Sequence, residues 1–293
     1  MLQIMKFLQL GLAIASFAAL GAVAHASENQ VVPIVGGTSV SNAEVIAKRT
    51  VGLFFITTKK ENGVCTGSIL DDSHILTAAH CVADYAQGLV VFANDKLLDY
   101  VKAAVKGGVS RVPQVRLMVS VKQEPGYSGQ EGGGDEFNDL AVITFQGGLP
   151  AGYQPAKFLS QVSAQAFLKQ GAKVTLAGYG ITQKAPQAGA PAMRTSMLAT
   201  APTPSPKPAQ PAPNTLGVGT LRQVDVQFAQ FSPKLIDLYV QGQPQHDACS
   251  GDSGGPSVVN IQGETYVVGV ASRSDCVHVS IYTFVNQSVV AGL

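Results

Sequence analysis

The sequence predicts an all-β fold, a barrel or a pair of packed sandwiches, and three observations support this. Short apolar or alternating segments dominate the chain, helical periodicity is scarce, and turn-forming residues are frequent. The 293 residues include 31 Gly and 16 Pro, which suits a turn-rich β protein better than a helical bundle. Because 46% of the residues are hydrophobic and only 13% are charged, the composition excludes global disorder.

The expected strands follow one another along most of the chain. Residues 67–70 and 74–77 flank the polar turn 71–73, which predicts a hairpin. Val115, Leu117, Val119 and Val121 alternate with mostly polar residues, the pattern of a half-buried strand. Further strands are expected at 51–57, 140–145, 224–228, 266–270 and 281–285, and only 163–169 has the pattern of a short helix.

Residues 1–26 have the features of a signal peptide. Lys6 precedes an apolar stretch at 7–24, and Ala24-His25-Ala26 forms an A-x-A cleavage signature. A membrane span is the alternative, but the polar sequence after Ala26 favours cleavage. We therefore expect a secreted or periplasmic protein with no membrane contact after cleavage of the signal peptide.

The cysteines and the net charge limit the kinds of site and partner. In an exported protein, Cys65, Cys81, Cys249 and Cys276 are disulfide candidates with three possible pairings, of which their spacing favours Cys65–Cys81 and Cys249–Cys276. A metal site is not expected, because the chain has no C-x-x-C and no histidine pair at ligand spacing. The net charge of +1 argues against a nucleic-acid partner.

One segment does not fit a compact β fold. Residues 184–214 are rich in Pro and Ala and are expected to be extended. The segment could link two domains, but the β pattern resumes on both sides, so we expect a loop inserted in one domain.

Three short stretches carry residues suited to acyl transfer. In Gly251-Asp252-Ser253-Gly254-Gly255-Pro256, flanking glycines can expose the serine and aim the amides of Gly251 and Ser253 at one point, as an oxyanion requires. Serine needs a base, usually histidine, and the imidazole needs a carboxylate to fix its tautomer. His80, in 76–81, and Asp139, in 138–143, can fill these roles.

Each residue also has a structural interpretation. His80 alone could be a buried histidine, Asp139 a cap before a strand, and the Gly-rich stretch a loop. That six-residue string should arise by chance in only roughly a few per 10⁵ chains of this length, however, so the joint catalytic interpretation is favoured.

These stretches resemble the trypsin-like serine proteases of the chymotrypsin fold. Residues 77–81, 139–141 and 251–256 match the family's histidine, aspartate and serine motifs, 34–37 match its mature N-terminus, and 178–180 match the start of its activation loop. The resemblance covers about 34–290. It implies an all-β fold of two six-stranded antiparallel β-barrels around a cleft, with catalytic residues His80, Asp139 and Ser253.

The resemblance also implies an activation pair and a specificity pocket. A free amino group on Ile34 would pair with Asp252 in the active form of a zymogen. The resemblance therefore implies a short propeptide at 27–33 and a peptidase domain at 34–293. The specificity pocket would comprise Asp247, Ser272, Ser274 and Ser280. Asp247 would form its floor and favour cleavage after Lys or Arg. Three features depart from the family: Pro33 precedes Ile34, Ser272 is followed by Arg273 and Ser274, and a wall position is Ser280. Arg273 could itself neutralise Asp247.

The sequence thus favours a secreted serine endopeptidase that needs no cofactor and acts on protein or peptide substrates, with an activating protease or a protein inhibitor as further partners. One alternative is a zymogen-like, non-catalytic binding protein on the same fold. Another is an α/β-hydrolase esterase, but there the histidine follows the serine, whereas here His80 comes first.

Overall fold

Six strands of the first part of the chain close into an antiparallel barrel, in the order β2-β3-β4-β7-β6-β5. The elements are, in sequence, β1 (Thr38–Ser39), a 3₁₀ turn (Ile46–Lys48), β2 (Thr50–Thr57), β3 (Asn62–Ile69), β4 (His74–Thr77), a 3₁₀ turn (Ala79–Val82), β5 (Tyr85–Val91), helix α1 (Leu97–Gly107), a 3₁₀ turn (Val109–Arg111), β6 (Val115–Gln123) and β7 (Ala141–Phe145). The hairpin expected at 67–77 is confirmed, because Ser68 pairs with Leu76.

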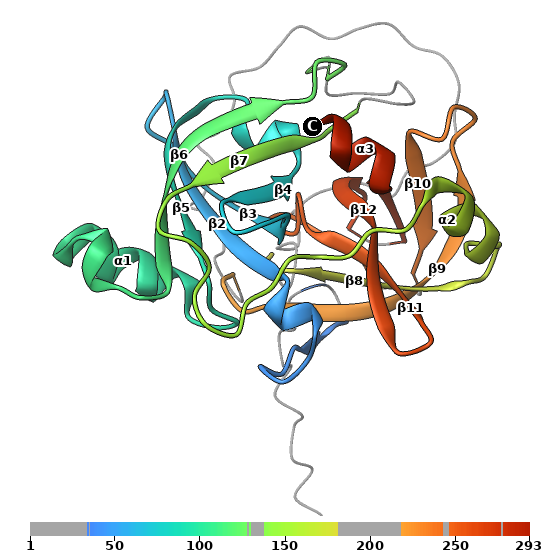
Figure 1. Ribbon diagram of the computed structural model, residues 1–293, viewed down its shortest axis with the longest axis horizontal. Helices are drawn as coiled ribbons and strands as arrows, with labels where there is room; N and C mark the ends of the chain where they lie inside the picture. The colour runs from blue at the N-terminus through green and yellow to red at the C-terminus, as the bar shows by residue number, and fades with distance from the viewer. Residues whose placement is uncertain are drawn as a thin grey trace, which may run out of the picture. The chain divides into compact units, whose positions relative to one another are not determined.

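Six antiparallel strands of the second part of the chain form a second barrel, which closes because β8 pairs with both β9 and β11. The short strand β1 pairs with β9. The elements of the second part are α2 (Gln161–Phe167), β8 (Lys173–Gly178), β9 (Arg222–Phe231), β10 (Asp237–Gln241), β11 (Pro256–Ile261), β12 (Glu264–Ser274), β13 (Val279–Phe284) and α3 (Gln287–Gly292). Figure 1 shows this barrel in yellow to red beside the first barrel in blue to green. The predicted architecture of two six-stranded barrels is confirmed.

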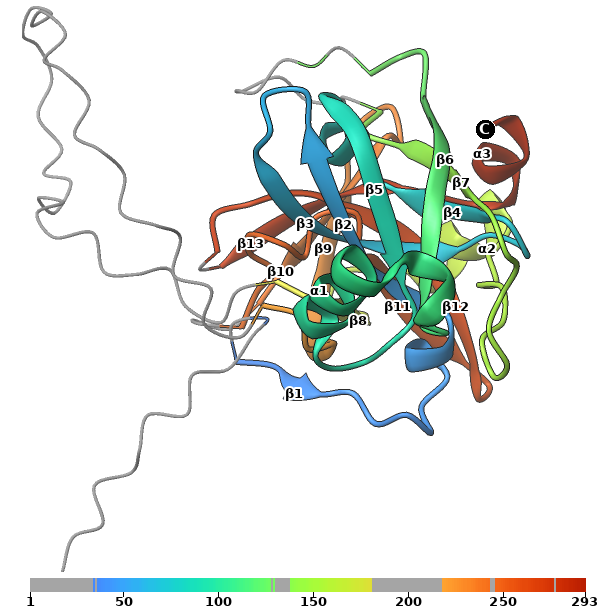
Figure 2. The same cartoon turned by 90° about the vertical axis from the view of Figure 1, so that its left-hand side faces the viewer.

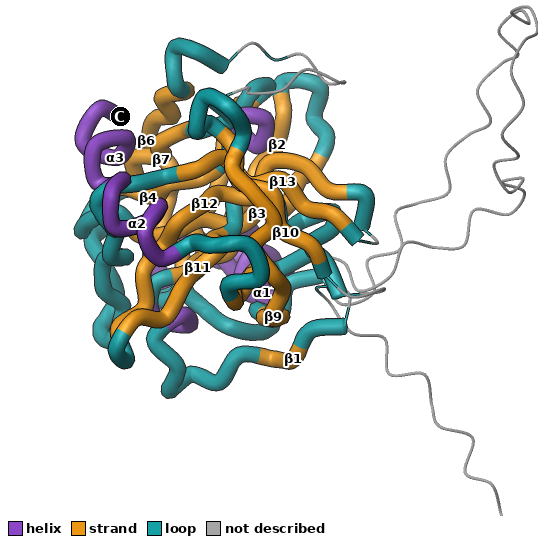
Figure 3. The backbone as a smooth tube through the Cα atoms, turned by 90° about the vertical axis from the view of Figure 1, so that its right-hand side faces the viewer, coloured by secondary structure: helices purple, strands orange, loops and turns teal. Residues whose placement is uncertain are grey.

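This is a computed structural model that describes residues 34, 36–127, 129, 138–180, 218–242, 246–276 and 278–293. The expected signal peptide 1–26, the segment 27–33 and the Pro/Ala-rich loop 184–214 lie outside the described residues. No helix in the described part of the chain is long and apolar enough to cross a membrane. Figure 3 shows the helices at the periphery of the strands.

Two details of the first barrel differ from the sequence prediction. Helix α1 was not expected, yet it lies beside the barrel (Figure 2) and buries Leu97, Val101 and Ala104. In β6, Leu117 is 40% exposed and Val119 49% exposed, although the alternation predicts that both share one half-buried face. The register of β6 against β7 shifts between Met118 and Ser120, and Met118 takes the buried position instead.

Contacts between the barrels place the two halves of the site. The fully buried Tyr179, at the end of β8, donates its hydroxyl to the carbonyl of Ala93, 2.8 Å away in the first barrel. Thr66, on β3, accepts a hydrogen bond from the Tyr179 amide at 3.1 Å and donates one to the Gly251 carbonyl at 3.0 Å. These buried bonds hold the serine loop against the strand that carries Cys65.

Both disulfides favoured by the cysteine spacing are present, Cys65–Cys81 and Cys249–Cys276. The first joins β3 to the turn that carries His80, and the second joins the serine loop to the segment after β12. The segments that carry His80 and Ser253 are therefore covalently tied to a barrel strand or its end.

Replacing Cys65 and Cys81 together by Ser is expected to lower the free energy of unfolding by about 3 kcal/mol, because the bridge closes a loop of 16 residues. Urea titration of the double variant and of the parent, with and without reductant, measures the difference. The single Ser variants serve as controls for the loss of one thiol. Equal urea midpoints for parent and double variant would contradict a stabilising bridge.

Candidate active site

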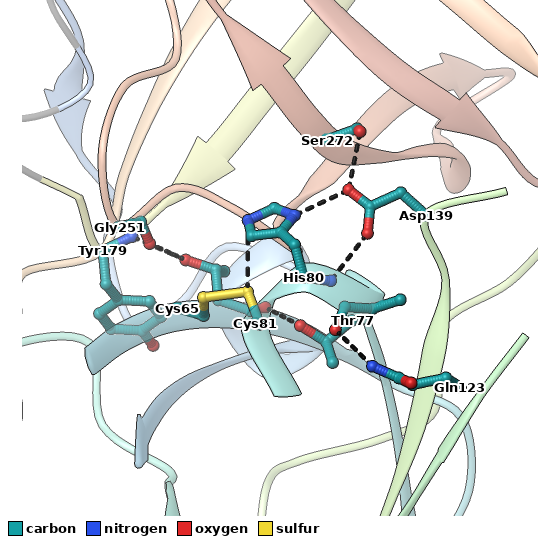
Figure 4. Close-up of a disulfide and its surroundings, with 11 residues drawn as sticks. Cys65, Thr77, His80, Cys81, Gln123, Asp139, Tyr179, Gly251 and Ser272 are labelled. Carbon is teal, nitrogen blue, oxygen red and sulfur yellow. Dashed lines mark hydrogen bonds and ion pairs between the residues drawn. A yellow bond between two sulfur atoms is a disulfide. The ribbon is translucent and has the colours of Figure 1, made fainter. Parts of the chain in front are cut away.

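His80 lies on the short 3₁₀ turn Ala79–Val82, directly after β4. The Cys65–Cys81 disulfide and a hydrogen bond from the Gln123 side chain to the Ala79 carbonyl, 3.1 Å long, fix the turn. The imidazole is 31% exposed and faces the second barrel, with its Nε2 3.8 Å from Cys81 Sγ (Figure 4). The ring is therefore partly accessible to solvent while its turn is fixed in place.

Asp139 is a buried carboxylate that holds His80 through two bonds. Its Oδ2 lies 2.7 Å from His80 Nδ1, and its Oδ1 accepts the His80 amide at 2.9 Å. Ser272, from β12 of the second barrel, donates its hydroxyl to Oδ2 at 2.7 Å (Figure 4). Three donors from two barrels therefore orient this carboxylate.

These contacts also set the charge of Asp139. Burial disfavours the ionised carboxylate, but the hydrogen bonds from His80 and Ser272 and the charge of His80 outweigh it. The pKa of Asp139 therefore lies below its ordinary value, and the group stays anionic beside the imidazole. An anionic partner fixes the Nδ1–H tautomer and leaves Nε2 to act as a base.

Ser253 lies in a tight loop between the second disulfide and β11. Gly251 has a φ of 95° and Gly254 a φ of 78°, values that a side chain would strain. A Cβ on Gly254 would also lie 2.4 Å from the Thr66 carbonyl oxygen. The serine loop can take this shape only because glycine occupies both positions.

Two amides of this loop are free to bind an oxyanion. The Asp252 amide donates to the Cys249 carbonyl at 3.0 Å, and the Gly254 amide to Ala271 at 2.8 Å. Among the described residues, the amides of Gly251 and Ser253 have no such acceptor. They are the two donors that the sequence assigns to the oxyanion.

The predicted site residues Ser253 and His80 are not linked by a hydrogen bond among the described residues. Within the described part of the chain, the hydrogen-bond partners of the His80 ring are Asp139 and Cys81, and Ser253 is not one of them. Catalytic hydrogen bonds are often long in the free enzyme and shorten when substrate binds.

The predicted activation pair is not formed in the described residues. Ile34 is fully buried among apolar side chains of the second barrel. The Asp252 carboxylate instead accepts the amides of Gly180 at 2.8 Å and Cys249 at 2.9 Å. Burial, with the charge of Asp247 adding to its effect, raises the pKa of Asp252 to about 7, although these two bonds oppose the shift.

A pocket of about 140 Å³ opens beside Ser253, and its walls include Ser272, Arg273, Ser274 and Ser280. Asp247 is fully buried and does not line the pocket. Its Oδ1 accepts the Ser280 hydroxyl and, at 2.8 Å, the Ala248 amide.

Arg273 forms an ion pair with Asp237, whereas the sequence suggested that Arg273 could neutralise Asp247. The Arg273 Nη2 lies 2.8 Å from Oδ2 of Asp237, a fully buried carboxylate on β10. The sequence did not identify Asp237, because nothing in its spacing connects it with the pocket.

Cys65, His80 and Cys81 form the one cluster of metal-type ligands among the described residues. The disulfide uses both sulfur atoms of this cluster. Because the thiolate is the metal ligand, the oxidised cluster cannot hold a metal ion.

The comparison with known families extends over most of the chain. The sequence model of the trypsin family matches residues 34–289. No curated protein sequence matches the chain. The family match includes both barrels and the segments that carry His80, Asp139 and Ser253, and it agrees with the observed fold. The chain therefore belongs to the trypsin family of chymotrypsin-fold serine proteases.

Proposed function

We propose that the protein is an exported serine endopeptidase that hydrolyses peptide bonds with His80, Asp139 and Ser253 through an acyl-enzyme intermediate. The observation that carries the proposal is the Asp139 carboxylate, which is buried and bonded to His80 Nδ1 at 2.7 Å. A carboxylate in this position fixes the tautomer of the histidine base and stabilises its protonated form. The free amides of Gly251 and Ser253 supply the site that would bind the oxyanion.

The proposed reaction proceeds in two acyl-transfer steps. Ser253 Oγ attacks the peptide carbonyl while His80 Nε2 takes its proton, and the amides of Gly251 and Ser253 bind the oxyanion. His80 then gives the proton to the leaving amine, and the C–N bond breaks. His80 next takes a proton from water, which attacks the acyl-enzyme carbonyl. The ester bond to Ser253 Oγ then breaks, and His80 returns the proton to Oγ as the new carboxyl group leaves. Asp139 stabilises the imidazolium at each stage.

Export is proposed from the signal-peptide pattern of 1–26, and two disulfides accord with an oxidising compartment. Removal of 1–33 would free the amino group of Ile34, which we propose then pairs with Asp252. The chain described here keeps Ile34 within the polypeptide, so Asp252 is a buried carboxyl that lacks a cationic partner among the described residues.

This arrangement predicts a pH dependence for the uncleaved chain. The folded pKa of Asp252 is about 7, above the 3.8 of an unperturbed Asp. Between these values the unfolded state loses the proton and the folded state keeps it, so stability falls as pH rises from about 4 to 7. Asp252→Asn is expected to remove this loss, on the order of a few kcal/mol.

Urea midpoints at pH 4.5 and 7.5 measure the effect in a Ser253→Ala background, which prevents self-cleavage. The exposed Asp72→Asn is the matched control. If Asp252→Asn changed with pH as much as its parent did, Asp252 would not be the group responsible.

Labelling with a fluorophosphonate tests the proposed function. The full chain, exported by an expression host, is treated with the probe, and its N-terminal residue is determined in the same sample. A Ser253 adduct on a protein that begins at Ile34 is expected. A folded protein that begins at Ile34 and gives no adduct would favour the non-catalytic binding protein on the same fold.

The sequence further suggests cleavage after Lys or Arg, with Asp247 as the partner of the basic side chain. That hypothesis requires the carboxylate to be reached from the pocket, and it stays a prediction of the sequence. The contacts of Asp247 lead us to a different substrate class.

A further inference from the structure

We infer that Ser274 and Ser280, and not Asp247, meet the substrate side chain, and that the pocket accepts a short uncharged side chain such as that of Ala or Val. This inference rests on the proposed peptidase function, because it names the substrate class of the same site. It differs from the cleavage after Lys or Arg that the sequence suggests.

The two serines form a polar layer between the pocket and Asp247. Ser274 on β12 and Ser280 on β13 are directly opposite each other in the strand register, and both line the pocket. The Ser280 hydroxyl bonds Oδ1 of Asp247, and the Ser274 hydroxyl lies 3.2 Å from Oδ2. Each oxygen of the carboxylate thus faces one serine, and Asp247 has no exposed surface.

Ser274 is held too firmly to move aside for a longer side chain. Its hydroxyl lies 2.7 Å from the Ala248 carbonyl, and its oxygen accepts the Cys276 amide at 2.8 Å. The Cys249–Cys276 disulfide fixes this segment to the serine loop. A new rotamer at Ser274 would break these bonds and leave buried polar groups without partners.

The charges around the pocket also disfavour a basic side chain. Among the described residues that line the pocket, Arg273 is the charged one, and its guanidinium is held by an ion pair with Asp237. This described lining therefore presents no carboxylate to an ammonium group. Burial raises the pKa of Asp247, although its hydrogen bonds from Ser280, Ala248 and Ser274 oppose the shift, so the floor carboxyl holds its charge less readily. A buried ammonium without a counter-ion is costly.

The test compares peptides that differ only in the residue whose carbonyl is attacked: Ala, Val, Lys, Arg or Phe. The exported protein is used, and kcat/KM is referred to the concentration of Ser253 that reacts with fluorophosphonate. For the natural chain we expect Ala and Val to exceed Lys by roughly 10²-fold, the discrimination that a pocket of fixed shape provides.

Variants locate the cause of this preference. Ser274→Gly with Ser280→Gly should uncover Asp247 and raise the Lys-to-Ala ratio at least roughly 10-fold, within the range that changes of pocket shape produce. Adding Asp247→Asn should reverse that gain. Ser120→Gly, at an exposed position of β6 outside the pocket, is the control and should leave the ratio unchanged.

Several results would overturn the inference. A natural chain that labels at Ser253 but prefers Lys or Arg, and loses this preference in Asp247→Asn, would show that Asp247 binds the substrate. Preference for Phe would show that the serines do not limit the size of the side chain. Absence of labelling would remove the proposed function itself, and the inference with it. If the double glycine variant does not fold, the natural profile and the single Asp247→Asn variant decide.

Discussion

Ser253→Ala is expected to lower kcat by roughly 10⁶-fold while the fold and both disulfides stay intact, because the variant lacks the nucleophile. The loop shape depends on Gly251 and Gly254, and on contacts of the Ser253 backbone such as the 2.8 Å bond from the Thr66 amide to the Ser253 carbonyl. None of these requires the hydroxyl. The loss should therefore appear in turnover and not in stability.

Peptide hydrolysis and thermal unfolding of parent and variant measure this difference. Ser120→Ala is the control, because it removes a hydroxyl from an exposed position of β6 and leaves the serine loop unchanged. It should retain most of the turnover. A Ser253→Ala protein with more than a small fraction of parental turnover would place the nucleophile elsewhere in the chain.

The sequence predicted local features better than features that depend on distant contacts, because residues close along the chain determine the local ones. The serine loop depends on glycines whose need is visible in the sequence, and the disulfide pairing was favoured by proximity along the chain. Alternation located β9, in which Val224, Val226 and Phe228 share one buried face, and short apolar runs located β7 and β13. In such segments the neighbours that decide the structure are close in sequence.

The errors arose where distant contacts decide the outcome. The bulge in β6 depends on its pairing with β7. The alternation therefore predicted that Leu117 and Val119 lie on the buried face of β6, whereas both are exposed. The apolar residues of α1 are spaced as on a helix face, Leu97, Val101 and Ala104, and that spacing could have revealed the helix. Ser272 was assigned only to the pocket, because its bond to Asp139 joins residues 133 positions apart.

The sequence identified His80, Asp139 and Ser253 as candidate catalytic residues in their chain order, but it did not identify the hydrogen bonds that orient them. The motifs identify His80 and Asp139 by residue type, and only the fold shows that Asp139 receives donors from both barrels. These donors distinguish an anionic, oriented carboxylate from a surface acid. The consequence is testable, because the charge can be removed while the shape is kept.

Asp139→Asn is therefore expected to lower kcat by roughly 10⁴-fold with little change in stability. The amide has the shape of the carboxylate and can still accept the His80 backbone N–H. It cannot, however, hold the imidazole as the charged carboxylate does across 2.7 Å to Nδ1, and the NH₂ group favours the tautomer in which Nε2 carries the proton. An imidazole in that tautomer cannot take the proton of Ser253.

The comparison variant is Ser272→Ala, which removes one donor to Oδ2 but leaves both bonds to His80. Its kcat should therefore fall by about 10-fold or less, as expected for the loss of one hydrogen bond. Initial rates and the rate of fluorophosphonate labelling should fall together in Asp139→Asn, with an unchanged unfolding temperature. If labelling stayed as fast as in the parent, His80 would not depend on Asp139 for its action as a base.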